Sequence, residues 1–204
     1  MTREEFERAF NCGECFGHGY LTERTADEAG ETSDVTTSTL AFVDGEAVAL
    51  PEPHTYGGAP LMTALLNRRS SREFSTDPIP LDVLSDLLWA ATGVNRKDSG
   101  KLTAPTAINR QNLTVYVATA RGLYRYNPQA HSLVPVVAGD LRAATGSQAF
   151  AATVPVNLVF VSDDSGMPGD PAGYDGLVYA GSHAGAVSQN VYLFAASAGL
   201  ATVV

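Results

Sequence analysis

The chain has 204 residues, of which 45% are hydrophobic and 17% are charged, a balance typical of a globular protein. This composition excludes disorder over the whole length and leaves room for one sizeable domain with a short appendage. Acidic residues outnumber basic ones by 22 to 13, giving a net charge of −9 and a pI near 4.8. Such a surface repels polyanions, so we expect neither a nucleic acid nor a membrane as partner.

The N-terminal stretch is charged and lacks the apolar core of a signal peptide, so we expect a cytoplasmic protein. Residues 1–20 are interpreted as a short helix followed by a polar, cysteine-containing stretch. Cys12 and Cys15 have the spacing of half a zinc site or of a redox pair, but a second ligand pair is missing. We therefore predict no metal site and keep a thiol or zinc protein as an alternative.

Residues 22–39 are rich in Thr, Glu, Asp and Ala and are interpreted as an acidic linker. Residues 39–50 predict a small hairpin with Asp44 and Gly45 at its turn. The predicted organisation is an N-terminal appendage and linker over 1–55 and a main domain over 56–204.

Two helices are predicted next. Pro60 suits the first turn of a helix that runs into residues 67–74. A second helix is indicated by apolar residues at helical spacing from Leu81 to Ala91 and is ended by Gly93. The polar stretch 95–101 is interpreted as a loop.

The following segment favours strands. Residues 113–119 and 123–126 form a predicted hairpin, and 132–137 a third strand. A helix is expected from Asp140 to about Phe150, then a strand over 154–161 with Pro155 at its start or at a sheet edge. Residues 163–175 are interpreted as a surface loop.

A long helix is predicted over 176–199 and ended by Gly199. Ala180, Ala184 and Ser188 fall on one line of this helix, with Gly181 and Gly185 beside it. Small residues at this spacing let another helix approach closely, including one across a dimer. Residues 200–204 begin a strand, and this apolar end indicates a chain cut short.

The stretch 67–74 places three arginines and two serines within five residues: Arg68, Arg69, Ser70, Ser71 and Arg72. Guanidinium groups are fork-shaped, permanent donors for phosphate or carboxylate, and a bound anion would relieve their mutual repulsion. The pattern therefore predicts an anion pocket for a phosphorylated cofactor. The alternative is a solvated helix end, where cations are ordinary.

The stretch 67–74 is the first candidate wall of a binding site, and residues 103–111 offer a second candidate wall. Pro105 fixes the backbone, while Thr106, Asn109 and Gln111 supply a hydroxyl and amides that suit a heteroaromatic ring. Thr106 is also a plausible helix N-cap, and both readings can hold because helix N-termini offer free N–H groups. His131 and His183 are interpreted as structural, and no catalytic acid or base is identified.

Several segments in order resemble the FMN-dependent nitroreductase family, in particular the branch related to thiazoline and oxazoline dehydrogenases. The segments that carry this resemblance are 65–74, 87–96, 104–107 with Asn109 and Gln111, 122–126, and 188–193 running into Gly199 and Leu200. They cover residues 57–204, and the first 55 residues lie outside the resemblance.

The resemblance implies an α+β fold with a central antiparallel-rich sheet flanked by helices and a long central helix. It also implies a homodimer with FMN at the subunit interface. Arg68, Ser70 and Arg72 match the family's phosphate-binding motif, with Arg69 assisting. The isoalloxazine ring is expected against Pro105, Thr106, Ala107 and Asn109, which often come from the partner subunit. The family continues beyond the central helix with further flavin contacts and a tail around the partner.

The implied function is an oxidoreductase that passes hydride or electrons through flavin N5 between NAD(P)H, or an oxidisable ring, and a small organic acceptor. The alternative is a catalytically degenerate domain that binds flavin or dimerises without turnover.

Overall fold

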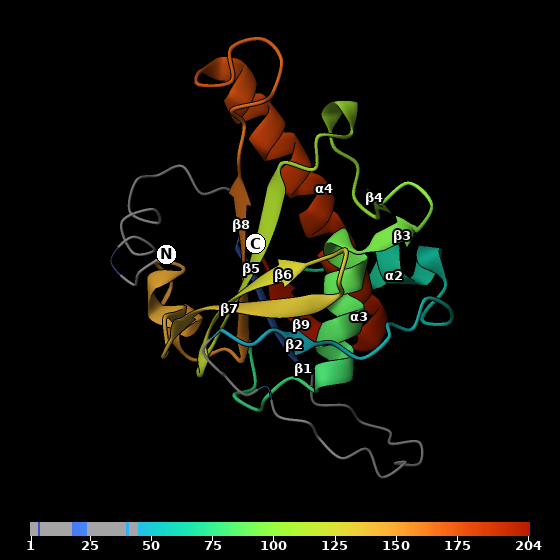
Figure 1. Ribbon diagram of the computed structural model, residues 1–204. Helices are drawn as coiled ribbons and strands as arrows, with labels where there is room; N and C mark the ends of the chain where they lie inside the picture. The colour runs from blue at the N-terminus through green and yellow to red at the C-terminus, as the bar shows by residue number, and fades with distance from the viewer. Residues whose placement is uncertain (1–3, 5–17, 24–39, 41–44) are drawn as a thin grey trace.

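A seven-stranded sheet forms the centre of the protein, seen in a computed structural model that describes Glu4, His18–Glu23, Leu40 and residues 45–204 (Figure 1). Its strand order is β2-β7-β6-β5-β8-β1-β9, and neighbouring strands are antiparallel throughout. The strands are β1 (His18–Glu23), β2 (Val48–Ala49), β5 (Leu113–Thr119), β6 (Gly122–Asn127), β7 (Ser132–Ala138), β8 (Val156–Ser162) and β9 (Leu200–Val203). The predicted α+β fold with an antiparallel-rich sheet is confirmed.

Between residues 45 and 204, three α-helices accompany the sheet: α2 (Leu61–Asn67), α3 (Leu81–Thr92) and α4 (Tyr174–Ala198). The main core lies between the sheet and α3 and α4. Leu84, Leu87 and Leu88 of α3 are buried there with Val187 and Val191 of α4. The leucine spacing that predicted α3 is thus the spacing of its buried face.

The other face of the sheet is covered by irregular chain. Two 3-10 turns, η2 (Arg142–Ala144) and η3 (Ala149–Ala152), stand where a single helix from Asp140 to Phe150 was expected, so that prediction is wrong. The Asp140 carboxylate accepts from the Arg142 side chain and backbone, and the Thr145 hydroxyl donates to the Arg142 carbonyl. These local bonds compete with a continuous helical ladder.

Two other segments differ from expectation. Residues 95–101, predicted as a loop, take part in a small hairpin of β3 (Val94–Arg96) and β4 (Lys101–Leu102). Val48 and Ala49 pair with β7, and the Asp44 of the predicted turn lies outside the described residues. Cys12, Cys15 and residues 24–39 also lie outside them, whereas Thr22 and Glu23 of the predicted linker belong to β1.

The two small-residue lines of α4 have different environments. Ala180, Ala184 and Ser188 are buried against the rest of the chain. Gly181 and Gly185 are exposed, and a Cβ atom added at either would meet no heavy atom within 4 Å. The helix ends at Gly199, as predicted, and the φ of 73° at this residue shows that it is a left-handed C-cap. No helix among the described residues has the length and apolar character needed to cross a membrane.

Candidate functional site

The arginine-containing segment follows directly from the end of α2. Arg68 caps the helix, and the Ser71 N–H donates to the Thr202 carbonyl of β9 at 2.9 Å. Tyr192 of α4 lies against the same segment: its hydroxyl is 2.9 Å from Ser70 Oγ, and the Arg68 guanidinium carbon is 5.2 Å from the centre of its ring. The segment is therefore held between β9 and α4.

The arginines of this segment form no ion pair with another described residue. Within the part of the chain that the structure describes, the ion pairs are His54–Asp86 and Arg142–Asp140, and none of Arg68, Arg69 and Arg72 has a carboxylate partner. Arg69, Ser70 and Arg72 are exposed and Arg68 is half-buried. Three guanidinium groups beside a serine hydroxyl form a donor set that suits a phosphate group.

The second predicted wall is a tight turn between β4 and β5, the 3-10 turn η1 (Ala107–Asn109). Ile108, Asn109 and Gln111 have φ values of 49°, 55° and 50°, each costing on the order of 1 kcal/mol for a non-glycine residue. The turn must therefore be held by contacts around it.

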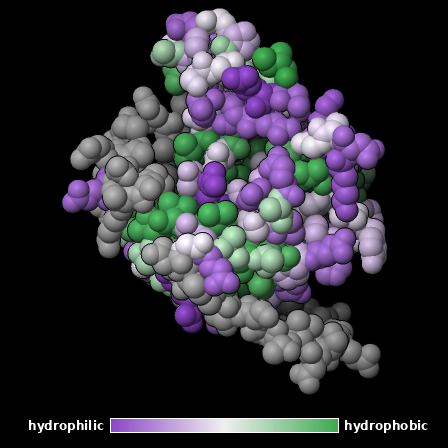
Figure 2. All heavy atoms as spheres, viewed as in Figure 1, coloured by the Kyte–Doolittle hydropathy of each residue, from purple (hydrophilic) through white to green (hydrophobic). Residues whose placement is uncertain are grey.

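Two side chains hold this turn from within. Thr106 stands at the predicted N-cap position of η1, but its side chain makes no capping bond to the turn. Its hydroxyl instead accepts from the Gln111 N–H at 2.9 Å, and the Gln111 amide donates to the Gly100 carbonyl at 3.0 Å. Gln111 thus supports the turn, whereas Pro105, Ile108 and Asn109 are exposed. In the view of Figure 2, hydrophilic residues gather at this upper end of the molecule.

A buried histidine holds the turn from outside. His183 of α4 accepts from the Ala107 N–H through Nε2 at 2.8 Å, and its Nδ1 is 2.8 Å from Asn112 Oδ1. The Asn112 amide nitrogen donates to Ser162 Oγ and to Asp164 Oδ1 at 2.8 and 2.6 Å. Burial lowers the pKa of His183, which Asp164 only partly opposes, so the ring is neutral at neutral pH.

The two candidate walls lie on opposite sides of α4 in one chain. Their contact residues, His183 and Tyr192, are nine positions apart on this helix. At 100° and 1.5 Å per residue, they point about 180° apart and are separated by about 14 Å along the axis. The predicted site residues therefore form two groups rather than one pocket within a single chain.

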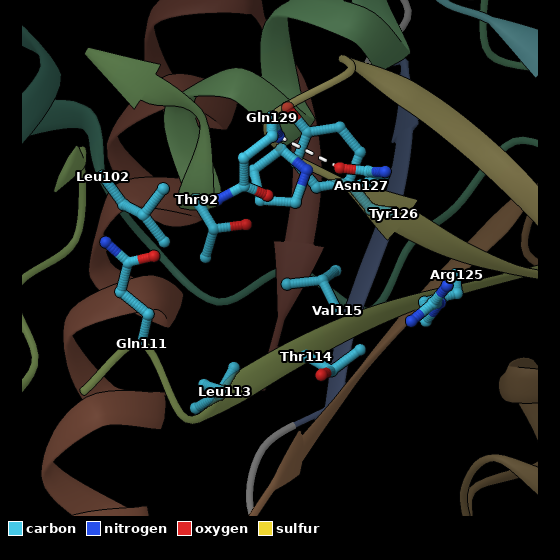
Figure 3. Close-up of a pocket in the computed structure, with 11 residues that line it drawn as sticks. Thr92, Leu102, Gln111, Leu113, Thr114, Val115, Arg125, Tyr126, Asn127 and Gln129 are labelled. Atoms are coloured by element: carbon cyan, nitrogen blue, oxygen red, sulfur yellow. Dashed lines mark hydrogen bonds between the residues drawn. The ribbon is translucent and has the colours of Figure 1, made fainter. Parts of the chain in front are cut away.

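The structure also contains a polar cavity and an open groove. A polar cavity of about 300 Å³ opens where β5 and β6 diverge, with Thr92, Gln111, Thr114 and Arg125 around it (Figure 3). An open groove of about 960 Å³ runs beside Trp89 and His131. Gln111 of the second predicted wall lines the cavity, whereas none of the predicted phosphate-binding residues lines the cavity or the groove. Among the described residues, no group of three or more His, Cys, Asp or Glu side chains could hold a metal ion.

Sequence reasoning missed Tyr192 and Asn112 as partners of the two walls. Both side chains contact residues about 70 to 120 positions away in the chain, so no local pattern distinguishes them from ordinary core residues. The structural interpretation of His131 agrees with its contacts, since its ring bonds Tyr126, Ser85 and the Pro51 carbonyl.

The family model described as "Nitroreductase family" matches residues 65–204. The nitroreductase-like protein MJ1384 of Methanocaldococcus jannaschii is 35% identical over 156 residues, which cover 70% of this chain and 76% of that protein. The crystal structure of a nitroreductase-like protein of Ralstonia eutropha JMP134 is 44% identical, with a TM-score of 0.72, over 80% of this chain and 78% of the other.

A more distant structure shares the fold only. The Escherichia coli microcin synthetase McbBCD complex matches at 16% identity and a TM-score of 0.54, over 94% of this chain and 77% of that chain. The family model and the relative that is 35% identical show that the chain belongs to the nitroreductase family. The family consists of oxidoreductases that generally use a flavin, and its fold is the one described above.

Proposed function

We propose that this protein is a homodimeric, FMN-dependent oxidoreductase that accepts electrons from NAD(P)H or an oxidisable ring and passes them to a small organic molecule. Arg68, Arg69, Ser70 and Arg72 of one subunit bind the FMN phosphate and ribityl chain. The turn of the partner subunit that contains Pro105, Thr106, Ala107 and Asn109 binds the isoalloxazine ring.

The observation that carries this proposal is the separation of the two candidate walls by α4. One flavin cannot reach both groups within one chain without passing through the helix. A two-fold axis would bring the arginines of one subunit beside the turn of the other. This arrangement makes use of both groups and predicts two equivalent sites per dimer.

The exposed apolar surface supports a dimer. Gly181 and Gly185 leave an open strip on α4, and Leu177 and Val178 nearby are 56% and 44% exposed. On α2, which packs against α4, apolar side chains are also exposed: Leu61, Met62, Leu65 and Leu66. Exposed apolar side chains concentrated on neighbouring elements commonly mark a protein interface.

In this proposal FMN supplies the hydride and electron transfer when bound. The protein contributes position and electrostatics. The guanidinium groups fix the phosphate, and the strained turn presents a rigid backbone to the ring. No side-chain acid or base is needed for these roles.

The first test is the visible absorption spectrum of the purified protein after FMN addition and removal of the excess. A retained flavin band that NADH or NADPH bleaches under nitrogen would support the oxidoreductase. A retained band that neither nucleotide bleaches would leave two readings, an oxidisable ring as the electron donor or the degenerate flavin-binding alternative. No retained band would contradict the cofactor assignment.

The arrangement of the site across two subunits has its own test. Arg68→Ala with Arg72→Ala should weaken FMN binding at least about 100-fold, because two charge-assisted contacts are lost. Arg121→Ala, which removes an exposed arginine at the β5–β6 turn, is the control and should bind normally.

Mixed dimers then distinguish a site shared between two subunits from a site contained within one subunit. A dimer of the double arginine variant with an Asn109→Glu chain contains one intact site if the walls come from different subunits. It contains none if both walls belong to the same subunit. Recovery of one FMN per mixed dimer is the expected result.

A further inference from the structure

His183 is well placed to control the turn at Ala107. It lies on α4, is only 5% exposed, and reaches across to a peptide N–H 76 positions earlier in the chain. Ile108 and Asn109 follow this peptide in left-handed conformations. The His183–Ala107 bond therefore anchors the start of a strained turn to the most regular element of the protein.

The protonation state of His183 follows from its neighbours. The Asn112 amide nitrogen donates to Ser162 and to the Asp164 carboxylate, so the Asn112 oxygen is the atom that faces His183. An oxygen requires a donor, which places the proton of the neutral imidazole on Nδ1. Nε2 is left with a lone pair and accepts from the Ala107 N–H.

A second proton on His183 would destroy this arrangement. Nε2–H and the Ala107 N–H would then be two donors facing each other at the position of a 2.8 Å bond. The amide would lose its partner, and the turn would lose its contact with α4. Protonation is therefore incompatible with the observed conformation of residues 106–109.

The surrounding charges limit when this happens. Asp164 is the titratable group closest in the network, through Asn112, and favours protonation. Asp163 and Arg110 lie further along the same loops, with the Arg110 guanidinium against Gly166. On α4 itself, the Tyr179 ring centre is 6.1 Å from that of His183. None of these forms a direct ion pair with the imidazole among the described residues.

We infer that neutral His183 is a positioning residue that holds the Pro105–Asn109 turn in its flavin-binding conformation, and that its protonation releases the flavin. This inference rests on the proposed function, because the ring contact of the turn is itself a proposal. Its distinctive consequence is acid-induced FMN release governed by a residue that does not touch the cofactor.

Two substitutions at His183 separate its role as a hydrogen-bond acceptor from its ability to be protonated. The Oε1 atom of His183→Gln can occupy the position of Nε2 and accept from Ala107, but it cannot be protonated near neutral pH. His183→Asn can reach Asn112 but is too short to accept from Ala107. We expect His183→Gln to bind FMN within about threefold of the wild type at pH 7.5. The His183→Asn protein should bind about tenfold more weakly, the effect of an unpaired buried N–H.

The decisive comparison is the pH profile of FMN release between pH 7.5 and 4.5. The phosphate of FMN titrates in this range, with a second pKa of about 6 for a typical phosphate monoester, and weakens binding in every variant. The wild type should show an additional loss of affinity, of at least about fivefold, that His183→Gln lacks. Identical profiles for the two proteins would overturn the inference.

A measurement without flavin keeps the inference separate from the cofactor assignment. Hydrogen exchange of the Ala107 amide should be slow in the wild type and His183→Gln, and at least about tenfold faster in His183→Asn. Equal protection in all three would overturn the inference even if FMN binds. A third outcome is that the wild type fails to bind FMN while the three proteins still show the expected differences in Ala107 amide exchange. That result would overturn the cofactor assignment and the role of His183 in flavin binding, but the His183–Ala107 hydrogen bond would still anchor the turn.

Discussion

Asn157 shows how one polar side chain organises the irregular face of the sheet. It is fully buried on β8, and its amide nitrogen lies near three acceptors: Ala151 O at 2.9 Å, Thr145 Oγ1 at 2.6 Å and Arg142 O at 3.2 Å. These acceptors belong to the two 3-10 turns and to the segment between them. Asn157 therefore takes the place of the internal hydrogen bonds that a regular helix would have provided.

We predict that Asn157→Ala lowers the free energy of unfolding by about 2–3 kcal/mol, because the buried Ala151 carbonyl and Thr145 hydroxyl lose the donor that the Asn157 amide provides. Urea denaturation measures the change. Gln129→Ala, which alters an exposed amide in the β6–β7 turn, should stay within about 0.5 kcal/mol of the wild type. Similar losses in the two variants would mean that Asn157 does not hold this face.

The candidate site could be predicted from sequence only where its residues are neighbours in the chain. Arg68, Ser70 and Arg72 form a compact chemical pattern, and their lack of carboxylate partners within the described residues agrees with an anion pocket. The anchors of the second wall could not be found in this way. His183 and Asn112 meet 71 positions apart, and only the packing of α4 against the start of β5 brings them together.

At the scale of elements, α4 carries two different surfaces. Its buried line was recognised as a row of small residues, but sequence alone could not say which row faces the core and which faces outward. The structure places Ala184 in the core, 5% exposed, and leaves Gly185 open. The two neighbouring residues should therefore respond to the same substitution in opposite ways.

We predict that Gly185→Leu retains a folded subunit, since nothing lies within 4 Å of its Cβ position and leucine favours the helix. The larger side chain should block close approach of a second helix and reduce the dimer fraction. Ala184→Leu should instead destabilise the subunit by about 1–3 kcal/mol through overpacking. Analytical ultracentrifugation and thermal unfolding distinguish these effects, and an intact dimer in Gly185→Leu would argue against this interface.

Strong periodic or alternating patterns were sufficient for most elements, including α3, α4 and the β5-β6-β7 meander. The helix expected after Asp140 was wrong because short-range polar bonds decided the conformation there. The β3–β4 hairpin has only Val94–Arg96 and Lys101–Leu102, which is too short to give an alternating pattern. The boundary near residue 55 remains a prediction.

At the scale of the whole molecule, the order of the strands in the sheet could not be predicted from local sequence patterns. β1 lies between β8 and β9, so that β8 and β9 run parallel with one antiparallel strand between them. His131 provides another long-range connection, since it joins the β6–β7 turn to Ser85 of α3 and to the Pro51 carbonyl. Through hydrogen bonds of this kind, the protonation of a single histidine affects segments that are far apart in the sequence.

The last prediction concerns the pH dependence of stability. Burial is the main cause that lowers the pKa values of both His131 and His183 below the ordinary 6.5. The unfolded chain therefore binds protons at these positions more readily than the folded chain. Stability should be fully present above pH 6.5, fall as the pH drops below that value, and level off below the two lowered pKa values.

Urea denaturation between pH 7.5 and 5 measures this slope, which is at most about 1.4 kcal/mol per pH unit for each histidine. His131→Gln with His183→Gln replaces both rings by amides that do not titrate, so the double variant should have a flatter profile whatever its absolute stability. Each single variant should remove part of the slope. An unchanged slope in the double variant would assign the acid sensitivity of this protein to groups other than the half-buried His131 and the buried His183.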